Sequence, residues 1–124
     1  MGDRICLTVP RARPYLGVAQ LVLGGVASRQ NFTLEALEDL QVAIEELLGR
    51  ERGNGSVTLE LELSDGSLNA RVGPFLPSAL RADLEPLGEQ ELGLRRVLDS
   101  TVDEVEVETR DDGDWVLITK AVHT

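Results

Sequence analysis

Apolar and polar residues alternate in five short segments of the chain, and a spacing of two predicts β-strands. These segments are residues 4–10, 57–63, 68–72, 105–108 and 115–122. The sequence Ser-Asp-Gly-Ser at 64–67 separates the second segment from the third, and Asp-Asp-Gly-Asp at 111–114 separates the fourth from the fifth. Asp-Gly pairs are suited to tight turns between antiparallel strands, so two hairpins are predicted.

A helix is predicted from Tyr15 to Gln30, behind Pro14, whose missing N–H would be unpaired in a first turn anyway. Apolar residues lie almost all round this segment, and such a helix must be covered on more than one side. Gly24 and Gly25 at its centre each cost about 1 kcal/mol of helix propensity, which predicts close packing against a neighbour. Two interpretations stay open: a core helix enclosed by its own chain, or a helix that also forms a subunit or partner interface.

A second helix is predicted to begin after Thr33, a residue suited to cap the first turn, and to end at Gly49. Its apolar residues have the spacing of one helix face, and they are Leu37, Leu40, Ile44, Leu47 and Leu48. Three prolines between residues 73 and 88 predict a loop region with one short helix at 79–84. A last helix is predicted over residues 89–99.

The predicted elements follow the order β-α-α-β-β-loop-α-β-β in a chain of 124 residues, a length that suits one domain over residues 1–124. Each strand has one polar or acidic face, so helices are expected to cover only the other face. The expected fold class is therefore α/β, a two-layer sandwich of a mixed, largely antiparallel sheet with helices on one face.

The charge of the chain narrows the classes of partner. Asp and Glu number 22 against 12 Lys and Arg, a formal net charge of -10, which argues against binding to nucleic-acid phosphates. Such a balance fits a soluble protein that meets a basic partner surface. No apolar stretch of about eighteen residues predicts a membrane span, and no signal peptide is recognised, so the expected compartment is the cytoplasm.

Few residues indicate chemistry by themselves. His123 is the only histidine, so neither a histidine-based catalytic triad nor a metal site is expected. Cys6 is the only cysteine, and it is expected to be a small buried apolar residue rather than a reactive thiol. The sequence contains neither a P-loop nor a Gly-x-Gly-x-x-Gly motif.

The order of the segments nevertheless resembles a known family. The segment VPRARPYLGVAQLVLGGVASRQNFTLEALEDLQVAIEELL, residues 9–48, is similar to the anti-sigma-factor serine kinases, which belong to the GHKL superfamily with histidine kinases and Hsp90-type ATPases. Residues 91–108, ELGLRRVLDSTVDEVEVE, resemble that family's Gly-Leu-Gly-Leu helix and the strand after it, and DGDWVLITKAV resembles its terminal strand. The resemblance covers nearly the whole chain and implies the Bergerat fold of these ATPases.

The resemblance also implies where a nucleotide would bind and which of its motifs this chain lacks. Glu46 matches the family's base toward a serine hydroxyl, but Arg50 replaces the Asn that holds Mg²⁺. The preferred interpretation of Glu46 is therefore a surface carboxylate paired with Arg50 one turn later, and the alternative is a residual base. The family's Asp-x-Gly motif has no carboxylate here, because residues 70–75 read Ala-Arg-Val-Gly-Pro-Phe. Its Gly-x-Gly motif reads Glu-Leu-Gly at 91–93, which puts a negative charge near phosphate oxygens. If ATP and Mg²⁺ bind, the resemblance implies that the nucleotide contacts Gly73, Gly93 and Leu94.

The resemblance implies three alternative functions. The first is a partner-switching regulator that binds a sigma factor and/or a STAS-type anti-anti-sigma protein, forms a homodimer, and has lost ATP binding and kinase activity. The second is an active ATP-dependent serine kinase that phosphorylates a STAS-domain partner, and the third is a dimerising module of a larger assembly. The first function, the partner-switching regulator, is preferred, and no cofactor is expected for it. Its expected partner or dimer interface consists of Leu16, Gln20, Leu23 and Gly24, and Gln20 stands where the family often has Arg.

Overall fold

The helices and strands follow the predicted order. The computed structural model describes residues 4–49, 55–64, 66–75 and 93–123. The elements within them are β1 (Arg4–Pro10), α1 (Arg13–Arg29), α2 (Leu34–Leu48), β2 (Ser56–Ser64), β3 (Ser67–Phe75), α4 (Leu94–Thr101), β4 (Glu104–Arg110) and β5 (Gly113–Ala121). The short helix expected at 79–84 and the beginning of the helix expected at 89–99 lie outside the described residues.

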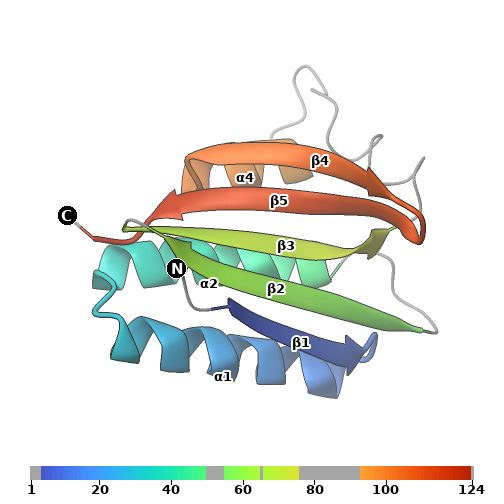
Figure 1. The fold of residues 1–124 in the computed structure, drawn as a ribbon, viewed down its shortest axis with the longest axis horizontal. Coiled ribbons are helices and arrows are strands. Elements are labelled where there is room, and N and C mark those ends of the chain that lie inside the picture. Colours follow the sequence, from blue (N-terminus) through green and yellow to red (C-terminus); the bar gives the residue numbers. More distant parts are fainter. Residues whose placement is uncertain (1–3, 50–54, 65, 76–92, 124) are drawn as a thin grey trace.

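The strands of the described residues form one five-stranded sheet in the order β1-β2-β3-β5-β4, and every neighbouring pair is antiparallel (Figure 1). The sheet is therefore not mixed in the part of the chain that is described. The two predicted hairpins are confirmed as β2–β3 and β4–β5. Gly66 and Gly113 adopt φ values of 79° and 139° at their turns, a region that glycine enters at little cost.

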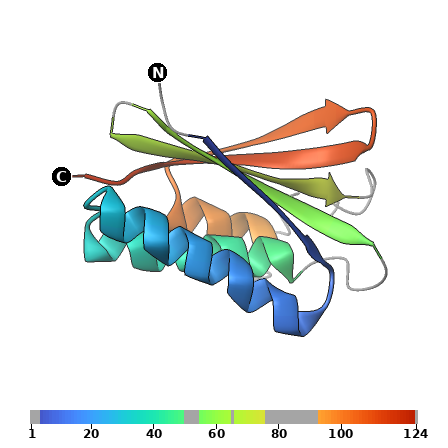
Figure 2. The same cartoon turned by 60° about the horizontal axis from the view of Figure 1, so that its bottom comes forward.

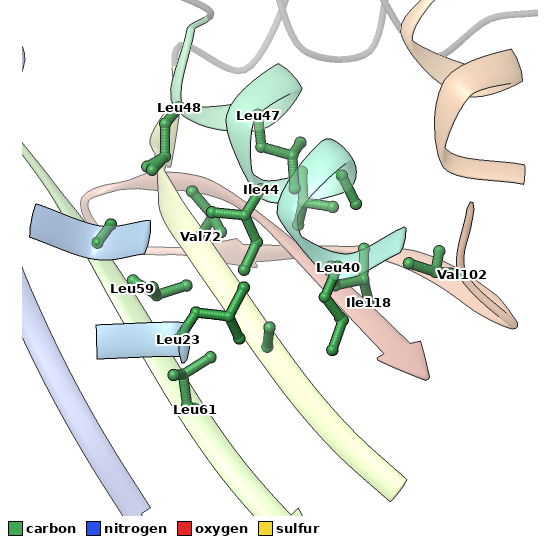
Figure 3. Close-up of a cluster of buried hydrophobic side chains, with 14 of the residues drawn as sticks. Leu23, Leu40, Ile44, Leu47, Leu48, Leu59, Leu61, Val72, Val102 and Ile118 are labelled. Carbon is green, nitrogen blue, oxygen red and sulfur yellow. The ribbon is translucent and has the colours of Figure 1, made fainter. Parts of the chain in front are cut away.

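The helices α1, α2 and α4 lie on one face of the sheet and leave the other face uncovered (Figure 2). Apolar side chains fill the space between the two layers, and Figure 3 shows part of this core. The labelled residues that join the helices to the sheet include Leu23, Leu40, Ile44, Leu59, Leu61, Val72 and Ile118, all of them buried. The predicted two-layer α/β sandwich is confirmed. None of the described helices has the length and apolar character needed to cross a membrane.

The second predicted helix begins and packs as expected. The hydroxyl oxygen of Thr33 accepts a hydrogen bond from the backbone N–H of Ala36 at 3.1 Å, which caps α2. Leu40, Ile44 and Leu47 on its apolar face are fully buried. Burial of this face supplies most of the helix's stability, because isolated helices of this length are marginal in water.

Two expectations about strands are wrong. β3 continues through Phe75 where a loop was expected from Gly73, and its pairing with β5 shifts between Val72 and Phe75. Proline lacks an N–H donor but fits a sheet at such an irregularity, so Pro74 does not end the strand. Cys6 is exposed rather than buried, because β1 directs Val9 and the alternate positions before it toward the helices and Cys6 toward the uncovered face.

Candidate functional site

Three elements that carry the predicted nucleotide residues meet at one end of the molecule. α2 and β3 end there, and α4 begins there (Figures 1 and 2). Glu46 is half-buried near the end of α2, Gly73 lies near the end of β3, and Gly93 is the N-cap of α4. The fold therefore brings residues that are distant in the sequence to the same end. No group of three His, Cys, Asp or Glu side chains within the described residues is arranged to hold a metal ion.

The N-terminus of α4 presents backbone N–H groups at this end. Gly93 has extended backbone angles (φ -68°, ψ 152°), and its carbonyl accepts hydrogen bonds from the N–H groups of Arg96 and Val97. The first N–H groups of a helix have no partner inside it, and they attract anions. Leu94 could contribute only its backbone to a ligand, because its side chain is buried in the core.

Gly73 makes room for an aromatic ring of the chain itself. A Cβ atom at Gly73 would lie 2.5 Å from Cδ2 of Trp115, so the indole packs directly against the glycine backbone. The guanidinium of Arg110 lies 4.0 Å from the indole centroid, and the indole N–H donates to Asp112 at 2.9 Å. Trp115 is therefore only 4% exposed although it lies on the sheet face that no helix covers. The requirement for glycine at position 73 is explained by this packing.

The residue two positions before Gly73 faces away from the helices. Arg71 stands where an Asp-x-Gly motif would have its carboxylate, and its Nε donates to Oε1 of Glu108 at 3.0 Å on the uncovered face. The neighbours that are buried at this end of β3 are Val72 and Phe75. The described part of β3 thus offers apolar side chains toward the helix layer. The two other departures from the family's motifs, at positions 50 and 91, lie outside the described residues.

Charged side chains of four strands are linked across the uncovered face. Glu60 accepts hydrogen bonds from Arg110 at 3.3 Å and from Arg4 at 3.4 Å. Arg110 also bonds Glu108 at 3.5 Å, and Glu108 in turn bonds Arg71. Burial raises the pKa of Glu60, but the hydrogen bonds and charges of Arg110 and Arg4 outweigh it and hold this pKa below its ordinary value. The carboxylate therefore stays ionised at neutral pH.

We expect the Glu60 carboxylate to stabilise the protein at neutral pH and not in acid. Because its pKa is lower in the folded than in the unfolded chain, its contribution is complete above the unfolded value of about 4.3 and is lost as the pH falls through the folded value. Glu60→Gln should lower the free energy of unfolding by about 1.5 kcal/mol at pH 7. Urea denaturation at pH 7 and at pH 3 should show this difference shrinking in acid.

The control for this prediction is Glu106→Gln, since Glu106 is an exposed glutamate of β4 in the same sheet. This substitution should change the free energy of unfolding by less than about 0.5 kcal/mol. A Glu60→Gln difference that is the same at both pH values would contradict the assignment.

The residues expected at a partner or dimer interface do not share an exposed surface. Leu23 is 0% exposed in the core, and Leu16 is half-buried against it. The side-chain Nε2 of Gln20 donates to the backbone carbonyl of Gln41 in α2 at 3.0 Å. Within the described residues, a Cβ atom at Gly24 or Gly25 would meet no neighbouring atom within 4 Å, so this part of the chain does not provide the close packing expected of the glycine pair. Leu16, Gln20 and Leu23 thus hold α1 against the sheet and α2, whereas Gly24 has no such contact among the described residues.

The exposed apolar residues of α1 lie on its opposite side. Tyr15, Val18 and Leu21 are spaced three apart and are 47%, 38% and 77% exposed, and Gly25 continues the same side of the helix. We call these four residues the outer stripe. The interpretation of α1 as a helix enclosed by its own chain is therefore wrong. Helical spacing could have identified the outer stripe, but apolar residues all round the segment concealed which side faces the core.

The fold agrees with a solved structure that contains two domains. The crystal structure of the RsbU and RsbW domains of Rv1364c from Mycobacterium tuberculosis matches 97% of this chain and 32% of that chain, with a TM-score of 0.69 and 14% sequence identity. An antiparallel sheet covered on one face by helices, with α2, β3 and α4 meeting at one end, is the GHKL or histidine-kinase-like ATPase architecture.

The relatives found by sequence are serine-protein kinases. The serine-protein kinase RsbW of Bacillus subtilis is 30% identical over an alignment of 142 positions, gaps included, and this alignment covers 96% of this chain and 86% of that protein. The protein of the same name from Listeria innocua is 35% identical over 81 residues, so this match spans 58% of the chain and half the length of the relative. No family model matches the chain. The chain belongs to the RsbW family of anti-sigma-factor serine kinases, which confirms the resemblance described above.

Proposed function

We propose that this protein is a partner-switching regulator that binds a sigma factor and/or a STAS-type anti-anti-sigma protein through α1. The observation that carries the proposal is the outer stripe, which leaves Leu21 77% exposed. Burial of one leucine side chain contributes about 1.5–3 kcal/mol, and clustered exposed apolar residues mark contact surfaces. The net charge of -10 favours a partner with a basic surface, because opposite charges speed the encounter of two proteins.

We further propose that ATP binding and kinase activity have been lost. Magnesium requires oxygen ligands, and the sequence has Arg50 where the family has its Asn. Two findings on β3 support the loss: Arg71 pairs with Glu108 on the uncovered face, and Gly73 is packed against Trp115. Sequestration of a partner needs only complementary surfaces, so it can continue without a nucleotide. Release would then depend on competition between partners rather than on phosphorylation.

Calorimetry with MgATP tests the loss of the nucleotide site. We expect no saturable heat at millimolar MgATP, because the chain has Arg50 in place of the Asn that holds the metal and Glu91 in place of the first Gly of the family's Gly-x-Gly motif. A thermal shift assay should agree, since a ligand that binds only the folded state raises the melting temperature with its concentration. Saturable binding, together with transfer of phosphate to a serine of a STAS protein, would assign the alternative function.

That alternative is an active serine kinase, and two observations favour it. Glu46 occupies the position of the family's base on α2, and Gly93 caps α4 at the same end of the molecule (Figure 1). In this reaction Glu46 would accept the proton of the substrate serine hydroxyl, and the N-terminus of α4 would stabilise phosphate oxygens. ATP and Mg²⁺ would be required, and Gly73 and Leu94 would contribute only backbone atoms.

A substitution in the outer stripe tests the partner surface. Leu21→Asp places a charge at the centre of the stripe, so we expect at least tenfold weaker binding of the partner. The tagged protein is first purified from its native cells, and mass spectrometry identifies the captured proteins. Titration of the captured sigma factor or STAS protein then compares the variants. The matched control is Leu34→Asp, because Leu34 is 70% exposed on α2.

An equal loss of affinity in Leu21→Asp and Leu34→Asp would contradict the assignment of this surface. So would the capture of proteins that are neither sigma factors nor STAS proteins. The same samples test the proposed homodimer by light scattering, which should give twice the 13.5 kDa mass of the chain. A shift of Leu21→Asp to the single mass would place the dimer contact on the outer stripe. A chain that has the single mass without substitution would refute the homodimer.

A further inference from the structure

A cavity lies at the opposite end of the molecule from the candidate nucleotide residues. Its volume is about 340 Å³, and its lining residues come from the last turns of α1, the beginnings of β1 and β3 and the end of β2. These segments lie together at one end of the molecule (Figures 1 and 2). Protein sites that bind small ligands have volumes of about 300–1,000 Å³. The cavity therefore has the size of a binding site for a small ligand.

The interior of the cavity is apolar. Five of the side chains that line it are Ile5, Val26, Leu61, Leu63 and Leu68. Leu61 and Leu68 are buried and connect the cavity to the core, whereas Ile5 is 36% exposed. An apolar cavity that is open to solvent on one side suits a ligand with a hydrocarbon part.

The rim of the cavity carries one guanidinium without an ion pair among the described residues. Arg29 is exposed in the last turn of α1, where its charge also interacts favourably with the helix dipole. Arg4 also lines the cavity, but its guanidinium bonds Glu60 on the uncovered face of the sheet. Gln30 bonds Val26 and His123 through its backbone, and its side-chain amide has no hydrogen bond to a described residue. Arg29 and Gln30 thus provide donors beside an apolar interior.

We propose that this cavity binds a small amphipathic carboxylic acid. The hydrocarbon chain lies against the apolar lining, and the carboxylate accepts hydrogen bonds from Arg29 and Gln30 at the rim. A guanidinium matches a carboxylate in charge and in planar geometry, which favours an acid over a neutral alcohol of the same length. The unbranched hydrocarbon chain of a fatty acid fits a cavity lined mainly by aliphatic side chains. The proposal does not depend on the proposed regulatory function, because it rests on the residues that line the cavity and on none of the residues of the outer stripe or of the nucleotide site.

Calorimetric titration of the full chain with decanoate and with decanol, both below the concentrations at which they aggregate, tests the proposal. We expect saturable binding of decanoate at one site and at least tenfold weaker binding of decanol. Arg29→Gln should weaken decanoate about tenfold and leave decanol unchanged. The matched control is Arg96→Gln, since Arg96 is an exposed arginine of α4 outside the cavity, and it should leave both affinities unchanged.

A second variant tests the position of the ligand. Val26→Phe fills part of the cavity and should abolish binding of both compounds, with circular dichroism to confirm that the variant is folded. Amide chemical shifts of the unsubstituted chain provide an independent readout, and decanoate should perturb Ile5 and Leu68. The proposal would be overturned if decanoate showed no saturable binding, or if decanoate and decanol bound with equal affinity. Chemical-shift changes confined to the end of the molecule where α4 begins would also overturn it. None of these outcomes would alter the MgATP or partner experiments.

Discussion

Leu23→Ala is expected to lower the free energy of unfolding by about 3–4 kcal/mol, because it leaves a cavity between α1 and the sheet. Leu23 is 0% exposed and lies with Leu59 and Leu61 in the core (Figure 3). Urea denaturation measures this loss as a lower midpoint with an unchanged slope. The matched control is Leu21→Ala on the same helix, which should cost less than about 0.5 kcal/mol because Leu21 is exposed.

The comparison of these two leucines also tests the orientation of α1. Similar losses of unfolding free energy in both variants would mean that the outer stripe is covered. Measuring this loss at several protein concentrations would then distinguish coverage by a second copy of the chain from coverage by the same chain. A second copy makes the stability of Leu21→Ala depend on concentration, since folding is then linked to association. A large loss for Leu21→Ala alone would contradict the described core.

Gly73→Ala is expected to destabilise the protein by about 2–3 kcal/mol and to expose its single tryptophan. The added Cβ would lie 2.5 Å from the indole of Trp115, and the ring cannot move freely because it bonds Asp112 and contacts Arg110. Tryptophan fluorescence measures the effect directly, as a shift of emission to longer wavelength. Thermal denaturation of the same variant gives the loss of stability.

Gly24→Ala is the matched control for this prediction, and its effect should have the opposite sign. No atom of the residues that the structure describes lies within 4 Å of a Cβ at Gly24, so the substitution gains helix propensity of about 1 kcal/mol without a clash. Unchanged fluorescence and stability in Gly73→Ala would refute the packing of Trp115 against β3. A destabilising Gly24→Ala would indicate that another molecule covers this side of α1.

The proposed loss of the nucleotide site and the proposed partner surface concern different parts of the fold. The candidate nucleotide residues come from α2, β3 and α4, whereas the outer stripe lies on α1 (Figure 2). Substitution of motif residues can therefore remove ATP binding while the surface for a partner stays intact. This separation explains how a member of a kinase family can continue as a regulator without catalysis.

The candidate site could be predicted only in part. Glu46 lies on α2 as the predicted second helix requires, whereas Gly93, expected inside a helix over residues 89–99, is the N-cap of α4. The motifs do not reveal that Arg71 faces the uncovered side of the sheet or that Gly73 is packed against Trp115. Both facts depend on strands β4 and β5, which follow β3 in the chain by many residues. The spacing of residues within one segment cannot predict which distant strand will lie beside it.

The amino-acid order alone was sufficient to predict the hairpins, the apolar face of α2 and the layered fold, because alternation and helical spacing are local properties of the chain. It was not sufficient for α1, where apolar residues occupy every side. There the packing of Leu23 against the sheet selects the core side and leaves Leu21 exposed. Cys6 and Gly73 were misjudged for the same reason, since their surroundings are created by strands that meet only in the folded protein.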